Sequence, residues 1–261
     1  MLAHERRNKI GTIIKNEGSV TVEIVTQSFG VSMMTAWRDL RELEKSGAVY
    51  RVHGGAVSAV SAPVISEQPF AGKQSVRTRE KEAIARYVAS ELIGSNDIII
   101  VEGGTTAAAV VPHLEAANIT LLTNGLNVLN RAAERLPYIT VMSCGGMLRE
   151  RSLTFVGPQA ESFFANHRAD KLVISAAAFS IPDGLMDPHP LEIQIKQAMA
   201  RCARQRIAVV DSSKFELRSL AIALSTDEID ILVTDDGVSA ETLQQLRRSD
   251  IDVRIANNAD S

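Results

Sequence analysis

The sequence predicts an α/β protein in two parts: an N-terminal winged helix-turn-helix joined to a doubly wound, mostly parallel α/β domain. A length of 261 residues is enough for two domains. The first part holds short amphipathic patterns around a glycine turn. The second part alternates aliphatic runs with helical patterns, which is typical of a parallel sheet. We expect the first domain at residues 1–57, a linker rich in Ser, Ala and Pro at 58–75, and the second domain at 76–261.

Composition sets broad limits on function. Hydrophobic residues make up 45% of the chain and charged residues 23%, as in ordinary globular proteins. The net charge of −3 gives no global signal for nucleic acid. The charge is uneven, however, because residues 1–57 carry eight Lys and Arg against six Asp and Glu, and the remainder is acidic. This asymmetry is compatible with DNA binding by the first domain alone.

Cysteine and histidine usage argues against a metal centre. Cys144 and Cys202 are far apart in the sequence without CxxC spacing, and the five histidines are scattered. We therefore expect no disulfide, no metal site and no cofactor. The N-terminus lacks the apolar run of a signal peptide, and no segment approaches membrane-spanning length. We therefore expect a cytoplasmic protein without a membrane partner.

Residues 32–47 predict the helix around which the first domain is organised. Ser32 is a good N-cap and Gly47 a good helix end. The apolar face of this helix consists of Ala36, Leu40 and Leu43.

The opposite face of this helix carries side chains of the kinds that contact DNA in a major groove. Thr35, Arg38 and Arg41 are suited to phosphates and guanine edges. Trp37 lies beside Arg38 and off the apolar face, which favours the DNA side for it too. An ordinary surface helix with solvated charges is the alternative, and it is supported by Asp39, Glu42 and Glu44.

The neighbouring segments complete a winged helix-turn-helix. We expect helices at 4–16 and 22–28, with Gly30 in the turn before the third helix. Beyond Gly47, AVYRVHGGAV predicts a two-stranded wing in which Arg51 and His53 could touch the DNA backbone. A plain surface hairpin would explain the same glycine pair.

The first strand predicted in the second domain is followed by a candidate phosphate site. The run DIIIV predicts a strand buried on both faces, and Gly103, Gly104, Thr105 and Thr106 follow it at the start of a helix. Amides and hydroxyls in such a turn suit a phosphate group. Glycine could equally be required there by turn geometry alone.

Further strands repeat this pattern. In a doubly wound sheet, ligands bind beyond the carboxyl ends of the strands. The residues expected at those ends are Glu102, Gly104, Thr105, Thr123, Asn124, Gly145, Gly146, Asp211, Lys214 and Asp235. This mixture of amides, hydroxyls and one Lys suits a phosphorylated polyol.

Together these motifs resemble the DeoR-type bacterial transcription regulators. VSMMTAWRDL and YRVHGGAV match the family's Ser-x-x-Thr-(aliphatic)-Arg-Arg-Asp-Leu and Arg-x-His-Gly-Gly-Ala elements, with Ala36 for a larger aliphatic and Trp37 for the first Arg. Residues 102–106 match Asp-x-Gly-(Thr/Ser)-Thr, with Glu102 for Asp. The family's Thr-Asn, Gly-Gly and Asp-x-Ser-Lys-Phe elements follow in order.

The resemblance implies a second domain with a fold like ribose-phosphate isomerases and CoA transferases. It also implies a double-stranded DNA operator, a phosphorylated sugar or sugar alcohol as effector, and a homo-oligomer. The candidate DNA-binding residues are Ser32, Thr35, Trp37, Arg38, Arg41, Arg51 and His53. The candidate effector-binding residues are Glu102, Gly103, Gly104, Thr105, Thr106, Thr123, Asn124, Gly145, Gly146 and Lys214.

Three functions are compatible with this pattern. The one we expect is a transcriptional regulator, mainly a repressor of a carbohydrate-use operon, controlled by the effector. A sugar-phosphate isomerase or acyl transferase could use Glu102, Asp211 and Lys214. However, a fold does not confer chemistry, and the acidic and Lys-Gly-Gly-Gly runs of ribose-5-phosphate isomerases are missing, so we expect no catalytic residue. A ligand-free dimeric DNA-binding protein is the third possibility.

Overall fold

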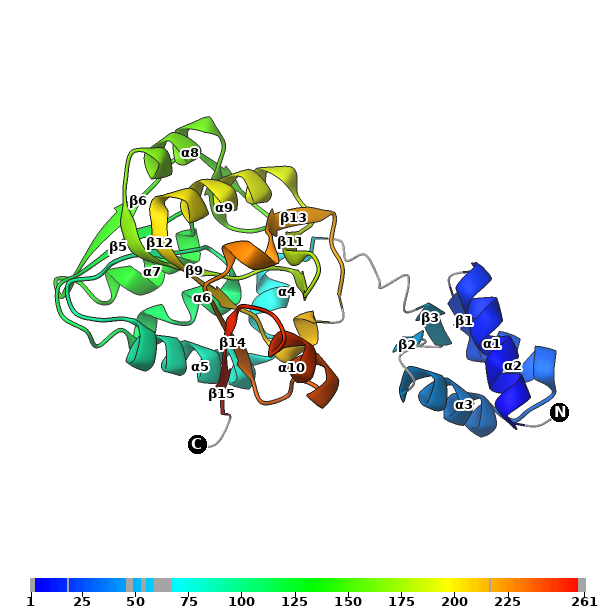
Figure 1. The fold of residues 1–261 in the computed structure, drawn as a ribbon. Helices are drawn as coiled ribbons and strands as arrows, with labels where there is room; N and C mark the ends of the chain where they lie inside the picture. The colour runs from blue at the N-terminus through cyan, green and yellow to red at the C-terminus, as the bar shows by residue number, and fades with distance from the viewer. Residues whose placement is uncertain are drawn as a thin grey trace. The chain divides into compact units, whose positions relative to one another are not determined.

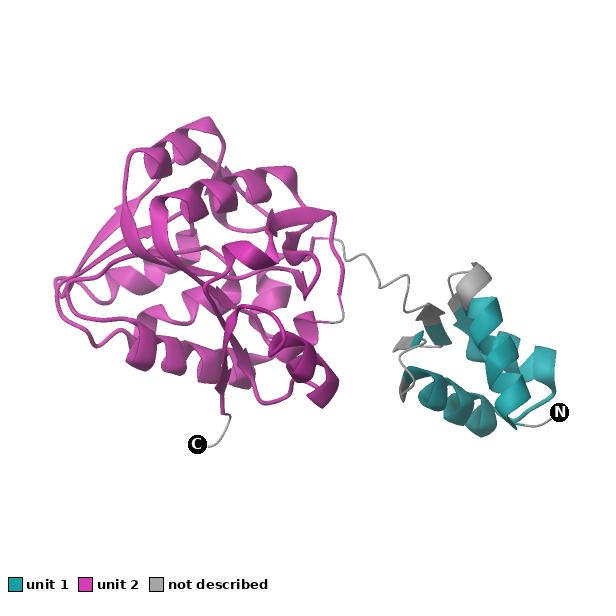
Figure 2. Cartoon of the chain, viewed as in Figure 1, with its two compact units in different colours: residues 1–64 teal, residues 65–261 magenta. Residues whose placement is uncertain are grey.

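The computed structural model describes residues 3–17, 19–45, 49–52, 55–58, 67–215 and 217–257. The chain divides into two compact units, residues 1–64 and 65–261 (Figure 2).

The first unit contains the three expected helices, α1 (Ala3–Glu17), α2 (Val22–Phe29) and α3 (Met33–Lys45). The side chain of Thr21 caps α2 by accepting a hydrogen bond from the Ile24 amide at 3.2 Å. Gly30 ends α2 in the left-handed conformation, with φ of 61°. Ser32 caps α3, because its Oγ accepts from the Thr35 amide at 3.3 Å. Gly47, the predicted end of α3, lies outside the described residues.

The wing has one strand more than predicted. Strand β1 (Ser19–Thr21) pairs with β3 (Gly55–Ser58), which also pairs with β2 (Val49–Val52), so the sheet order is β1-β3-β2. A three-residue strand between two helices gives almost no periodic signal in a sequence. Gly55 is needed where β1 and β3 meet, because a Cβ there would lie 2.1 Å from the Val20 carbonyl oxygen.

The core of the first unit is small and includes one charged residue. Ala36 and Leu40 are fully buried beneath α3, as the apolar spacing predicted. Asp39 is only 4% exposed, and its carboxylate accepts a hydrogen bond from Arg6 Nε of α1 at 2.6 Å. It is therefore not one of the solvated surface charges of the alternative interpretation.

The second unit is built on a seven-stranded sheet whose neighbouring strands are all parallel. This sheet confirms the predicted fold class. In chain order its strands are β4 (Ile98–Val101), β5 (Ile119–Thr123), β6 (Ile139–Ser143), β9 (Ala169–Ile174), β12 (Ala203–Val209), β14 (Ile231–Asp235) and β15 (Asp252–Ala256).

Helices cover both faces of this sheet (Figure 1). One face packs against α5 (Thr78–Tyr87), α6 (Thr105–Ala108) and α7 (Leu126–Ala133). The other face packs against α8 (Pro158–Ala165), α9 (Pro190–Cys202) and α10 (Ala240–Leu246). Neighbouring residues of β4 point to opposite sides, Ile99 into the first core and Ile100 into the second. Short helical turns are η2 (Val88–Leu92), η3 (Val111–His113), η4 (Ser212–Lys214) and η5 (Thr226–Glu228).

The direction in which the chain adds successive strands across the sheet reverses once. The order is β15-β14-β12-β9-β4-β5-β6. The chain therefore moves outward from β4 through β5 to β6, returns to the other side of β4 at β9, and moves outward again. The point of reversal lies between β4 and β9, where ligands bind in sheets of this type.

Two small antiparallel sheets were not predicted. One pairs β7 (Met147–Arg149) with β8 (Thr154–Val156). The other has the order β10-β11-β13, from β10 (Ala178–Ser180), β11 (Gly184–Asp187) and β13 (Ala221–Leu224). Gly184, at φ of 87°, passes so close to the backbone that a Cβ would lie 2.2 Å from the Leu224 carbonyl oxygen.

The end of the predicted linker belongs to the second unit. Residues 67–75 include a short helix, α4 (Phe70–Gln74), and the Phe70 amide donates to the Arg151 carbonyl at 2.8 Å. The composition of this segment is loop-like, and α4 buries no side chain completely. No helix among the described residues is long and apolar enough to cross a membrane.

We predict that Asp39→Asn destabilises the first unit by about 1.5–3 kcal/mol, because it removes the buried charged partner of Arg6. Trp37 is the only Trp of the chain, so its fluorescence during urea unfolding reports on this unit within the full protein. Glu42→Gln is the control. Glu42 lies 3.8 Å from Arg7 in a half-exposed pair, and a change of about 0.5 kcal/mol or less is expected. Equal effects of the two variants would contradict the assignment.

Candidate functional site

A pocket in the second unit lies at the reversal point of the sheet. Its wall includes residues just beyond the ends of three strands: Glu102 after β4, Ser175 after β9 and Asp211 two residues after β12. Side chains from α9, from the β7–β8 hairpin and from the segment around α4 complete it. The site therefore lies where parallel-sheet topology predicts, and its polar groups fall into two clusters.

The first cluster surrounds a buried ammonium group. Lys196 Nζ on α9 donates to Asp187 Oδ2 and to the Ser175 carbonyl, both at 2.6 Å, and lies 3.6 Å from Glu102 Oε1. Burial opposes the charge of Lys196, but attraction to Asp187 and Glu102 outweighs it and raises the pKa of Lys196. Lys196 is therefore protonated. Glu102 is fixed as well, because its Oε2 accepts from Ser175 Oγ at 2.9 Å.

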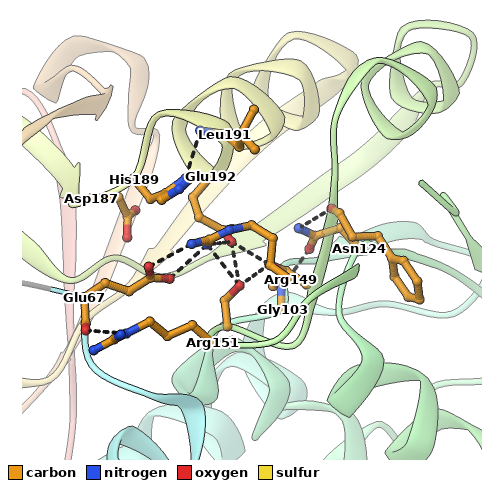
Figure 3. A network of polar contacts seen from close by, with 12 residues as sticks. Glu67, Gly103, Asn124, Arg149, Arg151, Asp187, His189, Leu191 and Glu192 are labelled. Carbon is orange, nitrogen blue, oxygen red and sulfur yellow. Dashed lines mark hydrogen bonds and ion pairs between the residues drawn. The ribbon is translucent and has the colours of Figure 1, made fainter. Parts of the chain in front are cut away.

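A second buried carboxylate, Glu192, lies one helical turn before Lys196. Its Oε1 accepts from Thr154 Oγ1 at 2.6 Å, Ser152 Oγ at 2.7 Å and Arg149 Nη1 at 2.5 Å (Figure 3). Burial alone would raise the pKa of Glu192, but these three donors outweigh it and lower the pKa. Glu192 is therefore ionised and held in place.

The other cluster is cationic. Lys73, Lys81 and Lys214 all line the pocket. Lys81 is 7% exposed, and its Nζ donates to the Lys73 carbonyl at 2.5 Å. Burial lowers the pKa of Lys81 to about 8, although nearby Asp211 partly offsets this. The buried Asp211 accepts from the Ser213 amide through Oδ1, while its Oδ2 has no hydrogen-bond partner among the described residues.

The glycine pair that joins the clusters is required by close packing. A Cβ on Gly103 would lie 2.5 Å from Thr154 Cγ2, and one on Gly104 would lie 2.0 Å from Ser175 Oγ. Thr105 and Thr106 follow at the start of α6 and line the same pocket. These glycines therefore let β4, β8 and β9 approach one another closely at the pocket.

The exposed surface of α3 carries most of the candidate DNA contacts. Ser32, Arg38 and Arg41 are exposed, and Thr35 is half-buried. Trp37 is half-buried and packs against the core of the first unit. Two apolar residues on α3 are also exposed, Met33 at 59% and Met34 at 74%. Arg51 lies on β2 with a side chain outside the described residues, and His53 lies wholly outside them.

Comparison with known proteins decides the family. A model of the DeoR C terminal sensor domain matches residues 76–236, and one of the DeoR-like helix-turn-helix domain matches residues 6–62. The chain belongs to the DeoR family.

Relatives of this DeoR-family chain are transcriptional regulators. It is 32% identical over 250 residues to the putative aga operon transcriptional repressor of Escherichia coli O157:H7, across 95% of this chain and 92% of that protein. It is 29% identical over 242 residues to the glycerol-3-phosphate regulon repressor of Escherichia coli K12, across 93% and 94%. Ribose 5-phosphate isomerase from Plasmodium falciparum aligns over 52% of each chain at 13% identity, with a TM-score of 0.39, too low to support an inference.

The structure brings six of the ten candidate effector residues of this DeoR-family chain into the pocket wall. They are Glu102, Gly103, Gly104, Thr105, Thr106 and Lys214.

The other four lie at or just beyond the carboxyl ends of β5 and β6 and are not part of the pocket wall: Thr123, Asn124, Gly145 and Gly146. Thr123 Oγ1 donates to the Val101 carbonyl at 2.6 Å, and Asn124 Oδ1 accepts from the Gly103 amide at 3.0 Å. Gly145 and Gly146 adopt positive φ angles of 63° and 106°. These four residues lie outside the pocket wall because β5 and β6 are one and two strands beyond β4, away from the reversal point.

Sequence reasoning missed most of the acidic cluster: Ser152, Thr154, Ser175, Asp187, Glu192 and Lys196. Within the described residues no group of His, Cys, Asp and Glu could hold a metal ion. One signal was available. Glu192 and Lys196 stand four residues apart on a helix that is apolar around much of its circumference, and such a helix is buried.

We predict that Gly104→Ala destabilises the second unit by about 1–3 kcal/mol, because the new Cβ forces Ser175 Oγ away and leaves buried Glu102 with fewer donors. Calorimetric unfolding of the full chain measures it. The matched control is Gly94→Ala, whose Cβ would meet only Asp97 at 3.6 Å, so about 0.5 kcal/mol or less is expected. A Gly104→Ala protein as stable as the control would mean that the close approach relaxes easily.

Proposed function

We propose that this DeoR-family chain is a sequence-specific DNA-binding repressor of a carbohydrate-use operon, released by a phosphorylated sugar or sugar alcohol. The observation that chiefly supports this proposal is that one pocket combines a cationic cluster with a separate cluster of fixed carboxylates and hydroxyls. Two relatives support it by name, one as a putative aga operon transcriptional repressor and the other as a glycerol-3-phosphate regulon repressor. The first unit would bind the operator, and the second would bind the effector and oligomerise.

The two clusters suit the two ends of such a ligand. A phosphate dianion would lie against Lys73, Lys81 and Lys214, near the hydroxyls of Thr105 and Thr106. Sugar hydroxyls would donate to carboxylate oxygens in the acidic cluster. Asp187 Oδ1 and Glu192 Oε2 suit this role, because neither makes a hydrogen bond within the described residues. Fixed acceptors of this kind can distinguish sugars by the positions of their hydroxyls.

The same contacts argue for binding without turnover. Isomerisation needs a carboxylate base free to take a proton from carbon. Glu102 is instead held by Ser175 and lies beside Lys196, and Glu192 accepts three hydrogen bonds. These donors weaken Glu102 and Glu192 as bases, so we propose that both act as hydrogen-bond acceptors. Formation of product from any bound sugar phosphate would overturn this part of the proposal.

Operators read by helix-turn-helix units are commonly two-fold symmetric, with half-sites about 34–36 Å apart. We therefore include a homo-oligomer in the proposal, which places two copies of α3 on one operator.

We predict that Arg38→Ala weakens operator binding by about 1–3 kcal/mol, because exposed Arg38 on α3 would lose a base or phosphate contact. The measurement is fluorescence anisotropy at fixed salt, on an operator selected from random DNA by the wild-type chain. Arg86→Ala, which removes an equal charge from an exposed position on α5, should leave the affinity unchanged. Unchanged binding by the Arg38 variant would rule out α3 as the recognition helix.

We predict that one or more phosphorylated sugars stabilise the full chain, by about 2.7 kcal/mol at 100 times the dissociation constant. Lys81 is protonated below its pKa of about 8 and neutral above it. Affinity should therefore fall as pH rises through about 8, where the phosphate is already dianionic. Thermal unfolding against a panel of sugar and polyol phosphates measures both effects.

Two variants sharpen this pH test. Lys81→Met should bind more weakly and lose the pH dependence near 8, whereas Lys9→Met, in the first unit, should behave like wild type. A panel without any stabilising compound would favour the ligand-free DNA-binding protein.

A further inference from the structure

Residues 67–76, here called the strap, line the pocket and also join the second unit to the first. Four of them line the pocket: Glu67, Gln68, Lys73 and Val76. The strap is also the first described segment of the second unit after the chain leaves the first unit. A ligand in the pocket therefore touches the segment through which the second unit is joined to the DNA-binding unit.

Polar contacts, rather than core packing, hold the strap in place. Its helix α4 has no fully buried residue. The Phe70 amide donates to the Arg151 carbonyl at 2.8 Å, Arg151 Nε donates to the Glu67 carbonyl at 2.9 Å, and Lys81 Nζ donates to the Lys73 carbonyl. Segments with little apolar burial detach at low free-energy cost. The strap is therefore an element that a ligand can stabilise.

Arg149 makes the strongest of these contacts. Its two Nη atoms bind the Glu67 carboxylate at 2.8 and 2.7 Å, and Nη1 also binds Glu192 Oε1 at 2.5 Å. Figure 3 shows Arg149 between these two carboxylates, one from the strap and one from α9. Its side chain is only 11% exposed, so water competes weakly for the pair. One guanidinium thus joins the strap to the acidic cluster of the pocket.

We propose that Arg149 is a positioning residue that couples the pocket to DNA binding by docking the strap through Glu67. The inference rests on the proposed function. A ligand that touches Gln68 and Lys73 binds the docked strap better and so shifts the strap toward docking. Undocking adds roughly ten residues to the connection between units, at most about 35 Å of extended chain. That length is comparable with the separation of operator half-sites, so docking of the strap would shorten the reach available to two DNA-binding units by an amount that matters on one operator.

The test uses the full chain with Glu67→Gln, which removes the ion pair but leaves Arg149 on Glu192. Hydrogen exchange of the strap is followed in chloride and in inorganic phosphate at equal ionic strength, and operator affinity is measured in both. In wild type, phosphate should slow strap exchange and weaken operator binding. In Glu67→Gln the strap should exchange about 10-fold faster, and the effect of phosphate on operator affinity should be smaller than in wild type.

Two further variants separate coupling from general stability. Arg151→Gln removes only the donor to the Glu67 carbonyl, so it should act in the same direction but more weakly. Glu82→Gln breaks a surface pair with His113 and should match wild type. Normal strap exchange in Glu67→Gln would overturn the proposal, as would faster exchange with an unchanged phosphate response. Because the exchange comparison needs no sugar phosphate, it is decided independently of the ligand panel.

Discussion

The reversal of strand order between β4 and β9 is the constraint on which the site depends. It opens a crevice at the carboxyl ends of neighbouring strands, and only there can Glu102 and Ser175 meet. Crossover connections place helices on both faces, which buries the strands and leaves their ends as the place for polar groups. Gly103 and Gly104 follow from the same constraint, because a side chain there would collide with Thr154 or Ser175.

A buried charge in this crevice must be balanced, and Lys196 shows how. Its ammonium group is stabilised by Asp187, Glu102 and a backbone carbonyl, which offset the cost of removing it from water. The Glu102 side chain is one methylene longer than Asp, and its two carboxylate oxygens meet different partners. One oxygen accepts from Ser175 while the other lies 3.6 Å from Lys196, so the longer side chain serves two partners. The departure from the family's Asp at this position is thus accommodated by contacts across the pocket.

The sequence was sufficient for the features that depend on local pattern. The helix cap at Ser32, the strands of the large sheet and the Gly-Gly-Thr-Thr turn all followed from residue order. Strand order is not local, so Thr123 and Gly145 looked equivalent to Glu102 although β5 and β6 end away from the pocket. The acidic cluster was missed for a related reason. Its members come from the β7–β8 hairpin, from the end of β9, from β11 and from α9, and only the folded sheet makes Ser175, Asp187 and Lys196 neighbours.

The energies of the two sides of the pocket differ in a way that suits regulation. Removing one partner from a buried ion pair such as Lys196–Asp187 costs about 3–5 kcal/mol, so that side is effectively fixed. The strap depends on hydrogen bonds to charged groups, each worth about 1.5–3 kcal/mol, with little apolar burial beneath them. Coupling free energies between sites are typically about 1–3 kcal/mol. A ligand can therefore change the population of the docked strap without enough free energy to disturb the acidic cluster, so the rigid side can select the ligand while the strap responds to it.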